Sequence, residues 1–335
     1  MRSAFVAITL AICLFFYASD ARAACISVDY DPGLAIRADN LQVLDKMKVG
    51  TPQLFKILKN TSLLESGGCW GGISDNFDGQ TLSAGILQWN YGSHSLQPLL
   101  KRFALQTGSA AALADFIKNN MPSYGTAIFS AGCLASKITE QCKAQILDGS
   151  GNPLGGVRAE FEVLFNSALM RQIQLDFVLT DFTQARDNIL ALSGKEQFSA
   201  RKVAWAFDMV VQQGHLPNAD NVARVRAAFA RRDPEKKKET LQNILAWYVA
   251  SCRAIDQDGC WRDYEYNVGV WTGMINAGLS DDQADLILMT YLRSRSATGE
   301  EGRWQALSFQ RRAAIVFGKG KLAQREVSFD YEGDL

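Results

Sequence analysis

Apolar residues recur along most of the chain at the spacing of an amphipathic helix. The stretch 52–64 places Leu54, Ile57 and Leu58 on one face. The same periodicity predicts helices over 96–105, 110–121, 159–175, 180–192, 200–213, 222–229, 241–248, 280–292 and 304–318. Ser280 and Gln283 have the spacing of a capping box at the start of one helix, and Gly318 can end the last one. The pattern therefore predicts a mainly helical protein.

One stretch interrupts this periodicity. Residues 66–80 read SGGCWGGISDNFDGQ and contain five glycines and two aspartates. Glycine at this density indicates turns and close backbone approach, and the apolar run 82–89 that follows fits a brief strand or a buried turn. Two further interruptions, 148–156 and the charged run 231–238, have the composition of loops. An irregular polar patch in a helical protein is where we expect the functional site.

The first residues have the pattern of a secretory signal peptide. Arg2 precedes an apolar run over 4–17, and Ala21-Arg22-Ala23 forms an A-x-A cleavage signal. The run is shorter than the ~20 residues that span a bilayer, which favours cleavage over a retained anchor. Lipidation at Cys25 is an alternative, although Arg22 stands where a lipobox has an aliphatic residue. We expect residues 1–23 to be removed and the rest to be periplasmic or secreted, without stable membrane insertion.

The cysteine count supports export. Of the seven cysteines, Cys13 leaves with the predicted signal peptide, and an even set of six remains. Such a set in an exported protein favours three disulfides over a metal site. Many connectivities are possible, and the short sequence separations favour two pairs, which leave a third: Cys133 with Cys142, Cys252 with Cys260, and Cys25 with Cys69. No C-x-x-C motif occurs and the chain has only two histidines, so we expect no metal and no cofactor.

The charge balance excludes one large class of partner. The 335 residues include 35 Lys+Arg and 35 Asp+Glu, and 47% are hydrophobic. Removal of the signal peptide takes away Arg2, Arg22 and Asp20, which leaves 33 basic and 34 acidic residues. A nucleic-acid-binding protein needs clustered basic residues to displace phosphate counterions. We therefore expect a globular chain that does not bind nucleic acid.

Two carboxylates flank the glycine-rich stretch. Glu65 ends a predicted helix just before the glycines, Asp78 follows 13 residues later, and Ser83 lies five residues beyond Asp78. Hydrolysis of a glycosidic bond uses two carboxyl groups, one to protonate the leaving oxygen and one to activate water or attack directly. The alternative interpretation is a surface carboxylate at a helix end and an Asp-Gly turn. Asp75 is a rival base, but it lacks a hydroxyl five residues later.

Three segments resemble known glycoside hydrolases. Residues 78–86, DGQTLSAGI, resemble the D-G-x-x-x-[TS]-x-G-[IV] segment of family 46 chitosanases and the D-x5-T-x-G pattern of phage-type lysozymes. Residues 206–214, AFDMVVQQG, are similar to the chitosanase segment Y-D-A-I-V-x-H-G. Residues 311–320 resemble the R-x-x-I-x-x-G-x-G close of phage endolysin-like chains. Together these matches run from about residue 50 to 330, nearly the whole exported chain.

The resemblance implies a fold and roles for single residues. It implies one domain over 24–335 with a lysozyme-like, mainly α (α+β) architecture: two helical lobes and a small β-hairpin at the active-site cleft. Glu65 matches the general acid, Asp78 the general base and Ser83 the hydroxyl that holds the attacking water, with inversion at the anomeric carbon. The carboxylates are closer in sequence than in the chitosanases, and Ser83 replaces a commoner threonine. Asp208 matches a structural ion network, with Arg311 or Arg312 as its partner.

These roles lead to an expected function. The candidates for sugar contact are Trp70, Trp89, Asn90 and Tyr91, whose aromatic rings could instead belong to the core. We expect a monomeric glycoside hydrolase that cleaves β-1,4 bonds of peptidoglycan. Three alternatives remain open: a chitosanase that uses the same residues, a glycan-binding or inhibitory protein of the same fold without catalysis, and a toxin or accessory factor with the same chemistry that a secretion apparatus delivers. Chitosan is polycationic and suits a cleft rich in carboxylates, whereas this chain is almost neutral.

Overall fold

Helices dominate the protein, as the periodicity predicts. The computed structural model describes residues 25–76, 79–193, 198–214, 217–254, 260–297 and 303–331, and the predicted signal peptide lies outside these ranges. Two small antiparallel sheets accompany the helices. Within the described ranges, no helix combines the length and the apolar character needed to cross a bilayer.

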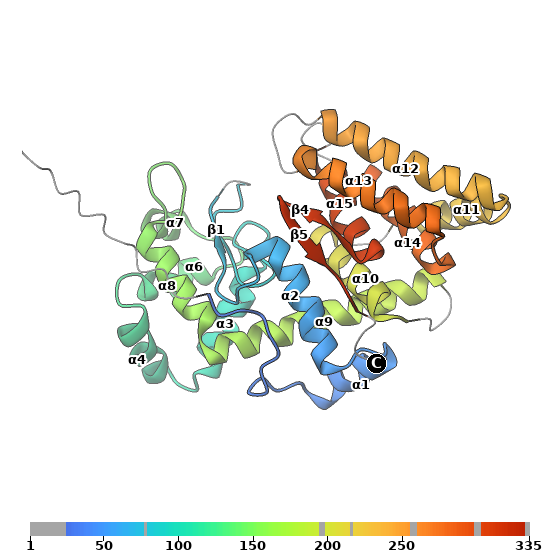
Figure 1. The fold of residues 1–335 in the computed structure, drawn as a ribbon. Coiled ribbons are helices and arrows are strands. Elements are labelled where there is room, and N and C mark those ends of the chain that lie inside the picture. The colour runs from blue at the N-terminus through green and yellow to red at the C-terminus, as the bar shows by residue number, and fades with distance from the viewer. Residues whose placement is uncertain are drawn as a thin grey trace, which may run out of the picture.

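An N-terminal group of elements, residues 25–166, forms the left and central part of Figure 1, except that its first helix lies lower right, beside the mark of the C-terminus. Its three short strands make an antiparallel sheet in the order β1-β2-β3, in which Ser83 pairs with both Ser74 and Asn90. The elements are α1 (Ala38–Lys46), α2 (Thr51–Ser66), β1 (Ile73–Ser74), β2 (Ser83–Ala84), β3 (Trp89–Asn90), α3 (Leu96–Gln106), α4 (Ala110–Asn120), α5 (Gly125–Ile128), α6 (Ala131–Leu134), α7 (Glu140–Ile146) and α8 (Gly155–Asn166).

A C-terminal group, residues 200–331, forms the right part of Figure 1, and the long helix α9 (Ala168–Ser193) runs beneath both groups. Strands β4 and β5 pair as an antiparallel hairpin that follows the last helix. The elements are α10 (Ala200–Gln213), α11 (Ala219–Ala230), α12 (Pro234–Ala254), α13 (Cys260–Ala277), α14 (Asp281–Arg295), α15 (Arg303–Phe317), β4 (Lys319–Leu322) and β5 (Arg325–Ser328).

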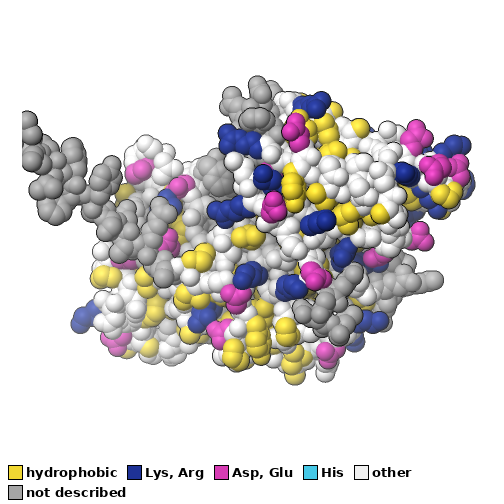
Figure 2. Space-filling model, in the orientation of Figure 1, with side chains coloured by type: hydrophobic (Ala, Val, Ile, Leu, Met, Phe, Trp, Pro, Cys, Tyr) yellow, Lys and Arg dark blue, Asp and Glu magenta, His cyan; other side chains and the backbone are white. Residues whose placement is uncertain are grey.

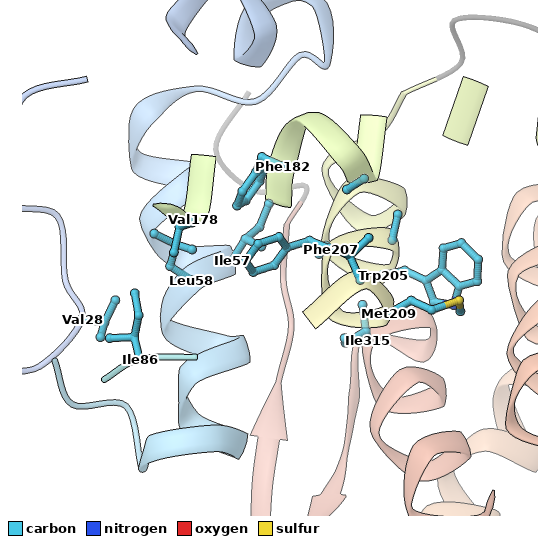
Figure 3. Close-up of a cluster of buried hydrophobic side chains, with 14 of the residues drawn as sticks. Val28, Ile57, Leu58, Ile86, Val178, Phe182, Trp205, Phe207, Met209 and Ile315 are labelled. Atoms are coloured by element: carbon cyan, nitrogen blue, oxygen red, sulfur yellow. The ribbon is translucent and has the colours of Figure 1, made fainter. Parts of the chain in front are cut away.

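A continuous hydrophobic core joins the two groups. Figure 3 shows Ile57 of α2 and Phe182 of α9 beside Phe207 of α10. The rings of Phe182 and Phe207 are stacked, with centroids 4.3 Å apart. All three side chains are almost completely buried. The core therefore fixes the positions of α2 and α10, which both end at the cleft described below.

One helix break lies elsewhere than the periodicity predicts. The pattern suggests helices over 159–175 and 180–192, whereas the structure has α8 up to Asn166 and α9 from Ala168 onward. Ser167 stands between them with an extended backbone. Its hydroxyl donates to Leu164 O at 2.6 Å and accepts from Met170 N at 3.4 Å. This one serine therefore ends α8 and caps the start of α9. Residues 177–179, which lie in the predicted gap between helices, are part of α9 instead.

The charged run 231–238 is only partly a loop, so that prediction is wrong for its second half. Helix α12 begins at Pro234 within the run. Proline suits the first position of a helix because its missing N–H would have no partner there. The Asp233 carboxylate accepts a hydrogen bond from Lys236 N at 2.9 Å and so caps the helix start. The lysines of the run therefore lie on a solvated helix.

The predicted disulfide pairs are confirmed. Cys133 bonds to Cys142, Cys252 to Cys260, and Cys25 to Cys69. The first two close short segments, whereas the third ties the start of the described chain to the loop after α2. Ser27 also forms a β-bridge with Cys69 at this point.

Asp181 on α9 allows a test of pH-dependent stability. Its carboxylate has no hydrogen bond or ion pair with a described residue, and burial raises its pKa from 3.8 to about 6. Ionisation of Asp181 therefore costs more in the folded protein than in the unfolded chain, and the cost is present above pH 6 and absent below pH 4. We expect Asp181→Asn to raise the free energy of unfolding by about 2–3 kcal/mol at pH 7.5.

Urea denaturation at pH 7.5 and pH 4 measures this effect. At pH 4 the variant and the native protein should have the same stability. Asp115→Asn, at an exposed position on α4, is the control and should change stability at neither pH. A gain for Asp181→Asn that is equal at both pH values would contradict the assignment.

Candidate active site

A cleft of about 530 Å³ lies between the two groups of elements. Its N-terminal wall is the end of α2 together with the β1–β3 sheet, and its C-terminal wall is built by α10, α15 and the β4–β5 hairpin. Most of the side chains on both walls are polar or aliphatic. The lining residues are Leu64, Glu65, Ser74, Ser83, Leu87, Gln88, Asn90, Val211, Gln212, Trp304, Leu307, Gln310, Arg311, Leu322 and Ala323.

Glu65 lies in the last turn of α2, at the floor of this cleft. The helix ends because Gly67 adopts a left-handed conformation with φ of 70°, which glycine adopts without a steric cost. The Glu65 side chain is 20% exposed, and its Oε1 accepts a hydrogen bond from Arg311 Nη1 at 2.5 Å. Oε2 has no hydrogen-bond partner among the described residues. One carboxylate oxygen is therefore held in place and the other is free to act on a ligand.

Arg311 connects Glu65 to a second, fully buried carboxylate. Its Nε donates to Asp208 Oδ1, and Arg312 Nε lies 3.5 Å from Asp208 Oδ2. Asp208 and Arg312 are completely buried, and Arg311 is 9% exposed. Asp208 pairs with both guanidinium groups and Glu65 accepts a hydrogen bond from Arg311, so each charged group of the network has a partner, as buried charges require. The structure thus brings Asp208 of α10 together with both arginines of α15.

Burial lowers the pKa of both arginines, whereas the nearby carboxylates raise it. Burial alone lowers the pKa of Arg311, but the Asp208 and Glu65 carboxylates outweigh it and raise the pKa above its ordinary value. Burial lowers the pKa of Arg312 to about 10; the Asp208 carboxylate opposes this decrease, and the nearby Arg311 and Arg293 add to it. Arg312 still carries its charge at neutral pH. It donates to Gln212 Oε1 at 2.6 Å and to Gln213 Oε1 at 3.0 Å.

The β1–β3 sheet supplies the opposite wall. Ser83 is 5% exposed and lines the cleft together with Ser74 and Asn90. Asp78, the predicted base, lies outside the described residues, as does Phe77. The rival base Asp75 does not line the cleft, and its carboxylate accepts a hydrogen bond from Arg158 Nη1 of α8 at 2.5 Å. Among the described residues, Glu65 is therefore the only carboxylate that lines the cleft.

Two amide side chains of this wall are held by hydrogen bonds. Gln88 donates to Gly85 O at 2.9 Å and to Gly72 O at 3.1 Å, and its Oε1 accepts from the Ser74 hydroxyl. Asn90 Oδ1 accepts from Ser93 N at 2.7 Å. Asn90 was predicted to contact sugar, and Gln88 was not. Both line the cleft in fixed orientations.

The aromatic predictions are wrong at two positions. Trp70 is completely buried and Tyr91 is 1% exposed, so neither ring offers a face to a sugar. Trp89 is 8% exposed and does not line the cleft. The aromatic residue at the cleft is Trp304 of α15, which the sequence analysis missed.

Gly85 fixes the turn between β2 and β3, and its substitution tests this wall. It has a φ of 82°, and an added Cβ would lie 2.6 Å from Gln174 Oε1 and 2.8 Å from Phe165 Cδ1. Gln174 cannot move freely because its Oε1 accepts from Ile86 N at 3.1 Å in the core. We expect Gly85→Ala to lower the free energy of unfolding by about 3 kcal/mol, from backbone strain and overpacking together.

Gly67 provides the matched control for Gly85. It also has a positive φ, of 70°, but an added Cβ would meet nothing within 4 Å. Gly67→Ala should therefore cost about 1 kcal/mol, the price of the backbone conformation alone. Chemical denaturation of both variants measures the difference, and equal losses would show that the close approach at Gly85 does not matter.

Charge and metal-ligand clusters give no competing site. On the face drawn in Figure 2, basic and acidic side chains are interspersed, without an extended patch of one sign. In the part of the chain that the structure describes, no group of three or more His, Cys, Asp or Glu residues could hold a metal ion.

Comparisons of the chain with protein families, curated proteins and solved structures find no match. Function is therefore inferred from the residues of the cleft. Of the predicted residues, Glu65, Ser83, Asn90 and Arg311 lie together there.

Proposed function

We propose that the protein is a glycoside hydrolase that cleaves β-1,4 bonds of peptidoglycan, with Glu65 as the general acid. The observation that carries the proposal is the placement of Glu65 and Ser83 on one cleft. They come from a helix end and a strand that are separated in sequence by the glycine-rich loop. The resemblance of residues 78–86 to chitosanase and lysozyme segments supports the same assignment.

The reaction requires two proton transfers. In the proposed mechanism, Glu65 Oε2 donates its proton to the glycosidic oxygen as the bond from that oxygen to the anomeric carbon breaks. Asp78 accepts a proton from a water molecule, whose oxygen bonds to the anomeric carbon from the opposite face of the sugar. The Ser83 hydroxyl orients this water, and the product has inverted configuration. Arg311 keeps Glu65 in place by binding Oε1.

The composition of the cleft favours peptidoglycan over chitosan. Asn90 and Gln212 offer amide groups, which can pair with the hydroxyl and acetamido groups of N-acetylated sugars. The amides of Gln88 and Gln310 also line the cleft, but they are engaged in hydrogen bonds within the protein. Among the described lining residues Glu65 is the only carboxylate, and the Arg311 guanidinium lies beside it. A polycation such as chitosan would find little negative charge here.

The test is the release of reducing ends from purified peptidoglycan and from chitosan. The native protein should release them from peptidoglycan, and NMR of the first products should show the inverted anomer. Release of reducing ends from chitosan alone would show that chitosan, and not peptidoglycan, is the substrate. Binding to peptidoglycan without release would show that the protein binds glycan and does not cleave it.

A further inference from the structure

A second groove lies on the N-terminal group, away from the cleft. It has a volume of about 580 Å³ and is formed by α5, α6, α7 and the segments between them. It shares no lining residue with the cleft. In Figure 1, α6 and α7 lie at the end of the molecule opposite to α12 and α14. The groove, which we call the α5–α7 groove, is defined by Ser123, Tyr124, Thr126, Ser130, Thr139 and Gln141.

The chemistry of the α5–α7 groove suits a neutral, hydroxyl-rich ligand. Its lining consists of hydroxyl and amide side chains, small residues, one aromatic ring and Cys142, and it includes no Lys, Arg, Asp, Glu or His. A phosphate or nucleic-acid ligand would require basic groups. An apolar peptide would require an apolar wall. Hydroxyl and amide groups beside a tyrosine match the alternating polar edges and flat faces of a sugar.

The hydroxyl groups of the groove are held in fixed positions. Ser130 Oγ accepts from Cys133 N at 3.3 Å, and Thr139 Oγ1 accepts from Cys142 N at 3.2 Å. Each hydroxyl uses a lone pair in this bond, so its own hydrogen stays available for a ligand. The Cys133–Cys142 disulfide links the two segments. The groove is therefore rigid before a ligand binds, which reduces the entropy lost on binding.

Tyr124 is positioned by contacts below the groove. The Glu160 carboxylate accepts from Ser123 N at 2.7 Å and from Tyr124 N at 2.8 Å. The ring packs against the backbone of α8 at Gly156, where an added Cβ would lie 2.5 Å from Tyr124 Cε2. The side chain remains partly exposed at the groove. A ring fixed in this way can stack on a sugar without losing freedom.

We propose that the α5–α7 groove is a second, non-catalytic binding site for a neutral amino-sugar chain. The identity of the polymer, peptidoglycan, rests on the proposed function. A second site on the same molecule raises the local concentration of the cleft at an insoluble polymer, because dissociation from one site leaves the other bound. The groove would increase hydrolysis of whole cell-wall sacculi and leave hydrolysis of short soluble chains unchanged.

The direct test uses a tetramer of N-acetylglucosamine as the probe and NMR of the native chain. The probe should shift the backbone amides of Ser130 and Thr139, and Thr126→Arg, which places a long charged side chain in the groove, should abolish these shifts. Ala144→Arg adds the same charge on α7 at an exposed position outside the groove and is the control. Unchanged shifts in Thr126→Arg, or no shifts in the native chain, would overturn the proposal.

The functional test compares two substrates. Thr126→Arg and, separately, Tyr124→Ala should lower retention on insoluble peptidoglycan about tenfold, with no change for Ala144→Arg. Rates on short soluble peptidoglycan fragments should stay at the native value in all three variants. Equal retention of the native and variant proteins would refute the proposal that the α5–α7 groove binds peptidoglycan. If the native protein cleaves neither substrate while the probe still binds the groove, only the proposed hydrolase function fails.

Discussion

Glu65→Gln is expected to lower the release of reducing ends from peptidoglycan by about 10³-fold, the usual contribution of a general acid. The amide has nearly the shape of the carboxylate, and its oxygen can still accept the hydrogen bond that Arg311 Nη1 donates. It cannot carry and donate the proton that the leaving oxygen needs. The expected loss is in kcat, because the groups that contact the sugar stay in place.

The control for this variant is Glu140→Gln, an exposed glutamate of α7 that pairs with Lys143. It should keep the native rate. Thermal unfolding of both variants should show that neither has lost its fold. A Glu65→Gln protein that keeps the native rate and the native stability would remove Glu65 from the mechanism. Asp78→Asn should cause a loss of the same order if Asp78 is the base.

Arg311→Met is expected to lower the free energy of unfolding by about 3–5 kcal/mol, the cost of leaving a buried charge unpaired. Asp208 is completely buried and would lose its closest counter-charge, and Arg312 Nε, at 3.5 Å, is a poor replacement. Adding Asp208→Asn to Arg311→Met should not restore the lost stability, because it removes the carboxylate that pairs with the fully buried Arg312. Urea denaturation of the single and double variants measures both effects.

Two further variants separate this network from an ordinary ion pair. Arg37→Met removes an exposed pair with Asp39 and should change stability by less than about 1 kcal/mol. Arg311→Lys keeps a charge but cannot bridge Glu65 and Asp208 with separate nitrogens of one rigid group, so we expect only partial recovery. If Arg311→Met costs no more than Arg37→Met, the buried network does not stabilise the fold.

The periodicity predicts the longer helices except α13, misses the short helices α1, α5, α6 and α7, and also fails where one side chain decides a boundary. Periodicity alone could not locate the break at Ser167, because the residues on both sides are apolar at helical spacing. The hydroxyl that bonds to both helices is a local polar contact that the pattern does not contain. Similarly, the charge of 231–238 conceals a helix start that Asp233 and Pro234 determine.

At the candidate site, the sequence identifies the residues that bear chemistry better than those that shape the cleft. Glu65 stands out because it directly precedes the glycine-rich stretch, and Ser83 because it lies in the segment 78–86. Trp70 and Tyr91 are aromatic residues that each precede a glycine in this part of the sequence, as sugar-contacting residues could. Only the packing shows that they belong to the core. Trp304 and Gln310 reach the cleft because α15 packs against α10, which in turn contacts α2, and no local pattern encodes these long-range contacts.

The disulfide between Cys25 and Cys69 makes the assembly of the cleft depend on the cellular compartment in which the disulfide forms. Cys69 lies four residues after Glu65, in the loop that leads from the proposed acid to the hairpin wall. Thiols stay reduced in the cytosol and pair in oxidising compartments. In a chain exported as its first residues predict, this closure would form only after the chain has left the cytosol, and the producing cell would then meet the fully assembled cleft only on the far side of its own membrane.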